Sequence, residues 1–366
     1  MNFIKFFKNF NWPIILPAFA LTLFGLLSIY SFSLAQGNFL NFKKQLIFFA
    51  FSIALVILLN FFNLKFLKNN SYFVFTFYFF SLVALLGLYF LGAEIRGDKG
   101  WYKIGDFFFD PVPFAAIFLI AILSKYFAVR HIEIKRLQTI FFSLLYLAIP
   151  FFLILFQPDI GSAFILIFIW LGIVVFSGLK FQHLLVLGLV ALIIFIVAWQ
   201  FWLKEYQKQR VMAFLNPESD PMGISWNVNQ SRIAIGSGGF WGKGIDKNFQ
   251  TQYGFLPEPQ TDFIFASIAE ATGFFGSFVL MFFLSFLFWQ ILKVALNAED
   301  NFTRLFAIGF AFLLISQSFI NIGMCLGLLP VIGIPLPFVS YGGSYLLAFY
   351  LGLGMLGRLS AVDEIY

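Results

Sequence analysis

The sequence predicts an all-α polytopic membrane protein, a bundle of ten transmembrane helices with one large outer loop. Of its 366 residues, 61% are hydrophobic and 11% are charged, whereas a soluble globular chain carries about 25% charged residues. Apolar runs recur along the whole chain, and about 20 such residues are enough to cross a bilayer. Only residues 203–261 form a long polar stretch. We therefore expect a single integral-membrane domain over residues 1–366.

The apolar runs define the expected helices in order. They cover residues 13–35, 46–62, 72–92, 112–128, 139–156, 160–177, 184–202, 263–292, 304–328 and 336–357. The first run is too long for the apolar part of a signal peptide. Only Gln157, Pro158 and Asp159 separate the fifth and sixth runs. Because proline ends a helix, these two runs are predicted to form a tight hairpin.

The positive charges predict the orientation of the bundle. With the N-terminus inside, the inner segments hold 12 Lys and Arg residues and the short outer loops hold 5, with the remaining 6 of the 23 in residues 203–261. Inner loops are enriched in Lys and Arg. We therefore expect both termini in the cytoplasm and residues 203–261 outside the cytoplasmic (inner) membrane. The net charge of +6 then reflects this orientation, and no nucleic-acid partner is needed to explain it.

The outer loop, residues 203–261, is the first candidate for function, because long loops in a compact fold are usually functional. Its glycines, Gly236 to Gly244, permit tight turns and close approach of a ligand. A flexible loop without a site is an equally good reading of this stretch alone. The two histidines, His131 and His183, both fall in predicted inner loops. A general base on the outer face must then be a carboxylate or a lysine.

Asp262 is the strongest candidate for that base. It is expected in the first turn of the eighth span, next to the apolar residues 263–265. Helical spacing places Ala266 and Ala269 on its face, and small residues allow close packing of helices. That face should point into the bundle. The alternative is a helix cap, since acids are favoured at helix N-termini.

Three further features have two readings each. Asp159 either caps the sixth span, which we favour, or pairs with an outer cation. Glu270 lies within a span, where acids are costly and usually functional, but it could also close a structural ion pair. Residues 327–345 hold three prolines and four glycines. Broken backbone at membrane depth is tolerated only against protein or a cavity, so this segment is expected to form a groove wall near the outer face.

At these motifs the sequence resembles the SEDS family (shape, elongation, division and sporulation). The resemblance rests on QPDIGSA (157–163), FLNPESDPMGISWNVNQSRIAIGSGGFWGKG (214–244), FLPEPQTDFIFA (255–266) and NIGMCLGLLPVIGIPLPFVSYGGS (321–344). The wording of the second motif is closer to the elongation branch of the family than to the division branch.

The resemblance implies a peptidoglycan glycosyltransferase that polymerises lipid II on the outer face of the membrane, for cell elongation and rod shape. It implies Asp262 as the catalytic acid. It implies Arg210 and Trp101 as substrate-binding residues, and we add as further substrate-binding candidates Glu258, Lys243, Gln230, Ser231, Asp159 and Ser340. It also implies a class B penicillin-binding protein, a transpeptidase, as a partner. We expect that partner against the eighth and ninth spans, at the small residues Gly273, Gly276, Gly309 and Ala311. The alternative, which we favour slightly for any single one of them, is that these residues pack the two spans against each other.

The chain departs from the family at its first outer loop and fourth span. Asp110-Pro111-Val112-Pro113 stands where the family has Gln-Pro-Ser-Glu. Gly100 stands where it has an arginine before Trp101, and Gln260 where it often has a histidine. These changes concern donor binding and leave the proposed base in place.

The implied reaction inverts the configuration at the anomeric carbon of the donor. Such a reaction requires a base on the acceptor side. Asp262 is that base. Arg210, Lys243 or a divalent cation, Mg²⁺ or Mn²⁺, would stabilise the leaving pyrophosphate. Two alternatives stay open: a lipid II flippase or other transporter, and a noncatalytic scaffold of the wall machinery. A division-type member of the same family is a third.

Overall fold

The computed structural model describes residues 11–62, 64–95, 98–130, 137–179, 205–216, 224–244 and 249–361, together with scattered positions between 182 and 201. The fold is mostly helical. The bundle consists of α2 (Trp12–Gln36), α3 (Leu40–Phe61), α5 (Ser71–Leu91), α6 (Val112–Val129), α7 (Leu137–Leu155), α8 (Ile160–Phe176), α13 (Ile264–Asn297), α14 (Asn301–Cys325) and α15 (Gly343–Ser360). A short helix, α4 (Lys65–Asn69), connects α3 to α5.

Seven helices in the described residues are long and apolar enough to cross a membrane: α2, α3, α5, α6, α7, α13 and α14. Helix α8 is apolar but has only 17 residues, and in α15 the glycines, serines and Arg358 lower the mean hydropathy. The predicted seventh span, 184–202, lies mostly outside the described residues. The described residues thus bear out an integral membrane protein with many apolar helices.

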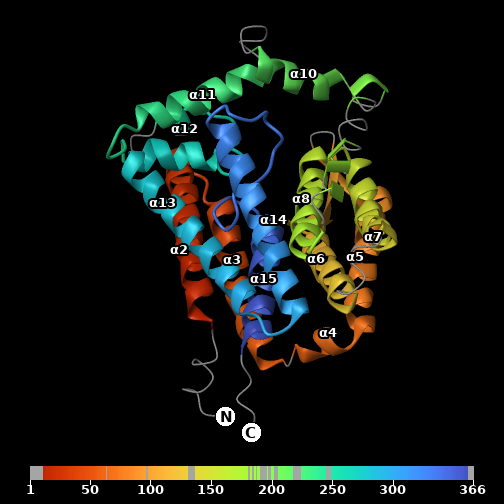
Figure 1. Cartoon of the computed structure of the whole chain (residues 1–366). Coiled ribbons are helices and arrows are strands. Elements are labelled where there is room, and N and C mark those ends of the chain that lie inside the picture. Colours follow the sequence, from red (N-terminus) through yellow and green to blue (C-terminus); the bar gives the residue numbers. More distant parts are fainter. Residues whose placement is uncertain are drawn as a thin grey trace, which may run out of the picture.

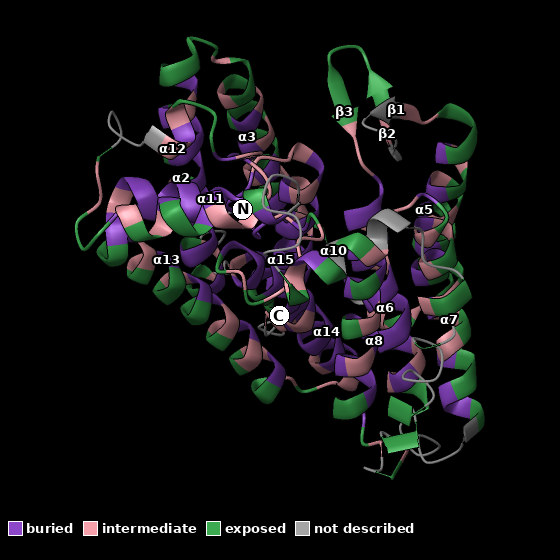
Figure 2. Ribbon diagram, turned by 90° about the horizontal axis from the view of Figure 1, so that it is seen from above, coloured by how far each residue is buried: buried purple, intermediate pink, exposed green. Residues whose placement is uncertain are grey.

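Helix α14 is the centre of the bundle. It packs against α13, α8, α6 and α15, while α13 also packs against α2 and α3 packs against α15. Figure 2 shows the consequence in the view from above, where buried residues line the middle of the molecule and exposed residues lie along the outward sides of α13 and α7. In a membrane protein those exposed apolar sides face lipid.

The last span begins later than predicted, at Gly343 instead of residue 336. Residues 326–342 form an irregular connection between α14 and α15. Pro335 and Pro337 prevent a helix there, and Ser340 bonds to a neighbouring turn instead. Irregular backbone was expected in this segment, but the prediction extended the helix too far into it.

A three-stranded antiparallel sheet was not predicted. It consists of β1 (Ala93–Ile95), β2 (Asp98–Ile104) and β3 (Phe107–Phe109), between α5 and α6. Ile104 pairs with Phe107 across a two-residue turn, where Gly105 has a φ of 61°. Glycine adopts this conformation readily, as such hairpin turns require.

The long polar stretch carries helices of its own. They are α10 (Glu205–Leu215), α11 (Ile224–Ser237) and α12 (Phe249–Gln252). Figure 1 shows them lying across one end of the bundle, while α4, the start of α2 and the end of α15 lie at the opposite end. Asn11 Nδ2 donates a hydrogen bond to Ser360 Oγ over 3.3 Å, which joins the residue before α2 to the last residue of α15. The predicted loop over 203–261 therefore contains helices that its polar sequence did not indicate.

Candidate functional site

Asp262 lies in a tight turn just before α13. The helix begins at Ile264 with Phe263 as its cap, so Asp262 is neither in the first turn, as predicted, nor the cap residue. The turn closes through hydrogen bonds from the amides of Thr261 and Phe263 to the carbonyl of Glu258, each 3.2 Å. Glu258 has a φ of 43°, which is uncommon for a residue other than glycine. Ala266 and Ala269 are buried, which confirms that this face of α13 points into the bundle.

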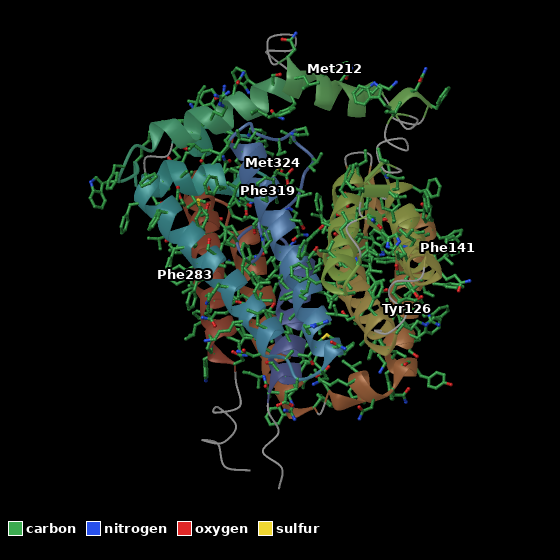
Figure 3. All side chains as sticks on the ribbon, viewed as in Figure 1. Tyr126, Phe141, Met212, Phe283, Phe319 and Met324 are labelled. Atoms are coloured by element: carbon green, nitrogen blue, oxygen red, sulfur yellow. The ribbon has the colours of Figure 1, made fainter. Side chains whose placement is uncertain are left out.

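The backbone of Asp262 is held from α14. Asn321 Nδ2 donates hydrogen bonds to the carbonyl oxygens of Asp262, over 2.9 Å, and of Ile334, over 2.8 Å. Cys325 Sγ donates to the same Asp262 carbonyl over 3.6 Å. Figure 3 labels Met324, the neighbour of Cys325, at this end of α14. One buried amide group therefore connects the Asp262 turn to the irregular segment 326–342.

The irregular segment lies against Asp262, as the predicted groove wall should. A Cβ atom on Gly333 would lie 3.5 Å from Asp262 Oδ2, and Gly333 has a φ of 71°. Ser340 Oγ donates to the Thr261 carbonyl over 2.7 Å and accepts from the Leu336 amide over 2.8 Å. Ser340 is buried, and its hydroxyl connects the Asp262 turn to the irregular segment. A contact between Ser340 and substrate stays a prediction.

Asp159 caps α8, as we favoured. Its Oδ1 accepts from the Ser162 amide over 3.0 Å. Asp110, before α6, accepts from the Val112 amide over 2.8 Å, and its own amide donates to Ser344 Oγ. The protein packed around Asp110 and then the negative charge of Asp159 raise the pKa of Asp110 to about 8. Burial likewise raises the pKa of Asp159.

This acid pair belongs to the same region as Asp262. A Cβ atom on Gly161, in the first turn of α8, would contact Ile332 and Ile334, the residues that flank Gly333. Ser162 Oγ lies 3.3 Å from the hydroxyl of Tyr345. The N-terminal ends of α6, α8, α13 and α15 therefore converge with the irregular segment, and they place three acids there.

Three predicted residues lie in the Asp262 turn or on α11. Glu258 is half-buried, and its Oε2 lies 3.5 Å from Thr261 Oγ1. Ser231, on α11, donates to the Cys325 carbonyl over 2.8 Å and is wholly buried. Gln230 lines an open groove of about 610 Å³ with Trp226, Asn229, Arg232 and Ile233.

Lys243, another predicted substrate-binding residue, forms an ion pair with Glu270. Its Nζ lies 3.2 Å from Glu270 Oε1 and donates to Ser237 Oγ over 2.7 Å. The wholly buried carboxylate of Glu270 also accepts from the amides of Gln250 and Thr251, over 2.9 and 3.1 Å. The structural ion pair considered for Glu270 is thus present, and the role of Lys243 toward a leaving group stays a prediction.

The glycine-rich segment around Lys243 packs on a break in α13. Gly273 has a non-helical φ of 68°, and the freed amides of Phe274 and Phe275 donate to the carbonyls of Gly239 and Phe240. A Cβ atom on Gly238 or Gly242 would overlap α13 backbone. These glycines therefore serve close packing between two backbones.

Two predicted substrate-binding residues, Trp101 and Arg210, remain to be placed. Trp101 lies in β2, opposite Ala93 of β1, and is half-buried. Arg210 lies on α10, but its side chain is outside the described part. No three His, Cys, Asp or Glu side chains gather into a metal cluster among the described residues.

Two functional candidates were missed from the sequence. Asn321 was quoted within a motif and given no role, although a buried amide in an apolar span is itself a signal of function. Asp110 was noted only as a departure from the family. Neither could be connected to Asp262 without the fold, because 59 residues separate Asn321 from Asp262.

Known proteins resemble this chain along most of its length. The FtsW/RodA/SpoVE family, described as cell cycle protein, matches residues 11–364. "Peptidoglycan glycosyltransferase MrdB" of Escherichia coli K12 is 37% identical over 280 residues, which is 76% of this chain and 75% of that protein. "Probable peptidoglycan glycosyltransferase FtsW" of Geobacter sp. M18 is 32% identical and covers 96% of this chain and 97% of its own.

A solved structure shares the fold. It is described as "Structural coordination of polymerization and crosslinking by a peptidoglycan synthase complex", and its chain aligns with a TM-score of 0.80 at 29% identity, covering 96% of this chain and 97% of that one. With the family match over nearly all residues, the conclusion is plain: this chain belongs to the FtsW/RodA/SpoVE (SEDS) family of integral membrane proteins.

Proposed function

We propose that this protein is a peptidoglycan glycosyltransferase that polymerises lipid II on the outer face of the cytoplasmic membrane, with Asp262 as the general base. One observation carries the proposal. Asp262 is a half-buried carboxylate whose backbone is fixed by Asn321 and whose side chain lies beside the irregular segment at Gly333. The names of the relatives support the same activity.

The geometry suits a positioned base. A general base contributes roughly 10²–10⁴-fold when it is held within hydrogen-bonding reach of the proton that it takes. The sugar 4-hydroxyl of the acceptor loses its proton to Asp262 as its oxygen attacks the anomeric carbon of the donor, and undecaprenyl pyrophosphate leaves with the bonding electrons. Both polyprenyl tails stay in lipid while their headgroups meet beneath α10–α12.

A divalent cation is part of the proposal. Mg²⁺ is usually held by one or two carboxylates together with substrate phosphates, and Glu258 is the carboxylate of the turn that would hold it, while Asp262 takes the proton of the acceptor. Such a cation would neutralise the departing pyrophosphate. Loss of polymerisation in EDTA, with recovery on adding Mg²⁺ or Mn²⁺, is the expected result.

The decisive test is Asp262→Asn in the purified protein with lipid II as substrate. This nearly isosteric change removes the proton acceptor, so we expect the glycan polymer to fall by at least 10²-fold while the melting temperature stays within a few degrees. Glu258→Gln is the matched comparison and should lose less. Near-normal polymer from Asp262→Asn would exclude it as the base. Because a transporter or scaffold would keep its function, the same variant separates the alternatives.

We also propose a class B penicillin-binding protein as partner, and elongation as the process served. The small residues expected to receive its helix are occupied within this chain: Gly276 and Ala311 are buried and Gly309 packs on Ile120 and Ile173. Those positions were therefore wrong. The lipid-facing side of α13, with Phe278, Phe282 and Trp289 exposed, remains for such a helix.

Copurification tests this placement. We expect Phe282→Ala with Trp289→Ala to weaken copurification with the transpeptidase, whereas Phe80→Ala, an equally exposed change on α5, should not. If the α13 double variant and Phe80→Ala copurify equally well with the transpeptidase, α13 is not the interface. Depletion of the protein in cells tests the process: rounded cells would support elongation, and filaments would indicate division.

A further inference from the structure

A second cleft lies far from Asp262, at the other end of the bundle. It has a volume of about 300 Å³ and lies between α6 and α7, lined by Tyr126, Arg130, Phe142, Leu145, Tyr146 and Ile149. Lys125 Nζ, on α6, donates a hydrogen bond to the Lys68 carbonyl of α4. The cleft is thus close to the α4 end, which the charge count predicts to be cytoplasmic. Figure 3 labels Tyr126 and Phe141 on the two helices.

The walls of the cleft are apolar and face outward. Phe142, Leu145 and Ile149 are each about half exposed, at 50, 45 and 49%. Because α7 is long and apolar enough to span the membrane, these side chains meet acyl chains and not water. The cleft is therefore open to lipid along its length.

The floor of the cleft is fixed by tyrosines. The rings of Tyr126 and Tyr146 lie 5.6 Å apart, edge to face. Tyr126 donates a hydrogen bond to the Thr139 carbonyl over 3.1 Å, and Tyr78 donates to the Tyr146 carbonyl over 2.6 Å. A site whose floor is held in this way loses little side-chain entropy when it is filled.

Arg130 supplies the only charge among the described lining residues. Its guanidinium carbon lies 4.5 Å from the centre of the Tyr126 ring, a cation–π contact that holds the group over the mouth of the cleft. Arg130 is exposed, and none of the described residues forms an ion pair or a hydrogen bond with its guanidinium. Its N–H donors match the oxygens of a phosphate group.

We propose that this cleft binds one anionic glycerophospholipid of the inner leaflet, with an acyl chain between α6 and α7 and the phosphate on Arg130. Basic pockets between transmembrane helices on the cytoplasmic side are typical sites for anionic headgroups. A zwitterionic lipid would add a cation close to Arg130, which disfavours it. The prenyl pyrophosphate substrate is not the occupant that we propose, because the cleft is at the end opposite Asp262.

The test uses the full-length protein, purified in detergent and stripped of lipid. Phosphatidylglycerol and phosphatidylcholine with identical acyl chains are added separately, and bound lipid is counted by native mass spectrometry. We expect phosphatidylglycerol to bind at least tenfold more tightly. Arg130→Gln should remove about this factor, since a charge-assisted hydrogen bond contributes at least about 1.5 kcal/mol.

Two further variants make the result specific. Lys293→Gln removes another exposed cation, near the end of α13, and should keep the preference for phosphatidylglycerol. Ile149→Trp fills the cleft and should remove one bound lipid without changing glycan polymerisation. Equal preference in Arg130→Gln and the unmodified protein would overturn the proposal. So would undecaprenyl phosphate displacing phosphatidylglycerol from this cleft.

Discussion

Two acids, Asp110 and Asp159, show at the scale of single residues how surroundings change an ionisable group. Each is half-buried at the start of a helix, and each accepts a hydrogen bond from its own helix start. Those bonds favour the charged form, but the packed protein around the carboxyls outweighs them, so the pKa of both is raised. Asp110, with a pKa of about 8, is therefore mostly protonated at neutral pH.

We predict that Asp110→Asn stabilises the protein at alkaline pH. An ordinary aspartate in the unfolded chain has a pKa near 3.9. Between about pH 4 and 8 the unfolded chain loses this proton while the folded chain keeps it, so folding stability falls as the pH rises. Asparagine cannot ionise and keeps an oxygen for the Val112 amide.

The measurement is the melting temperature at pH 4 and pH 8.5. The difference between variant and unmodified protein should be small at pH 4 and should exceed about 2 °C at pH 8.5, roughly 1 kcal/mol for a chain of this size. Asp106→Asn, a change at an exposed position nearby, serves as control. A difference that does not change with pH would contradict the assignment.

The sequence alone predicts only some of the residues that form the candidate site. Asp262, Asp159 and the segment 327–345 were singled out because acids and prolines are costly at membrane boundaries, and the fold places all three together. The roles of Ser340, Ser231 and Lys243 depend on partners far along the chain, such as Glu270 for Lys243. Local sequence does not determine which distant backbone a hydroxyl or an ammonium will meet.

At the scale of elements, α13 is two helical segments joined at Gly273. The break is filled by residues 238–244, which donate to and accept from the freed backbone groups on both sides. Lys243 and Glu270 then connect the same two segments through side chains. The first turns of α13, which follow the proposed base, are thus fixed by the glycine-rich segment.

We predict that Gly238→Ala destabilises the protein by about 1–3 kcal/mol, the usual cost of overpacking, because its Cβ would overlap the Ala269 carbonyl. Gly236→Ala, two residues earlier, is the matched control. Nothing lies within 4 Å of that added atom, so it should be neutral or stabilise by up to about 1 kcal/mol. Thermal unfolding of both variants in one detergent decides the matter, and equal effects would show that close packing at Gly238 is unimportant.

Hydropathy predicted the interior of most helices but not their connections. Apolar composition alone identifies α2, α5, α6, α7 and α14 within a few residues. It could not predict the sheet of β1–β3, whose strands have 3, 7 and 3 residues, too short for a periodic signal. The helices α10 and α11 were also missed, because their sequences are polar and their helical state depends on packing against the bundle.

At the scale of the whole molecule, the two ends of the bundle differ in kind. One end carries α4, the start of α2 and the end of α15, and the other carries α10–α12 (Figure 1). Lys68 lies at the first of these, paired with Asp300 over 2.7 Å. The proposed orientation places that end in the cytoplasm and Asp262 outside.

Single cysteines can test this orientation, because the native Cys325 is buried and should not react. We predict that Gln209→Cys, on α10, is labelled in intact cells by a membrane-impermeant maleimide. Asn69→Cys, at the end of α4, should be labelled only after the membrane is opened. Both positions are exposed. The opposite labelling pattern would place the Asp262 site in the cytoplasm. His131 and His183 would then lie outside and would again be candidates for a general base on the outer face.

The contact between Cys325 and the Asp262 carbonyl has a spectroscopic consequence. The sequence contains one cysteine, and its thiol donates to the backbone of the proposed base. The S–H stretch absorbs where other protein groups are silent in the infrared, so the unmodified protein carries a single vibrational band that reports on this carbonyl. A shift of that band when a sugar-lipid is added would record, without any label, the moment at which the carbonyl of Asp262 moves.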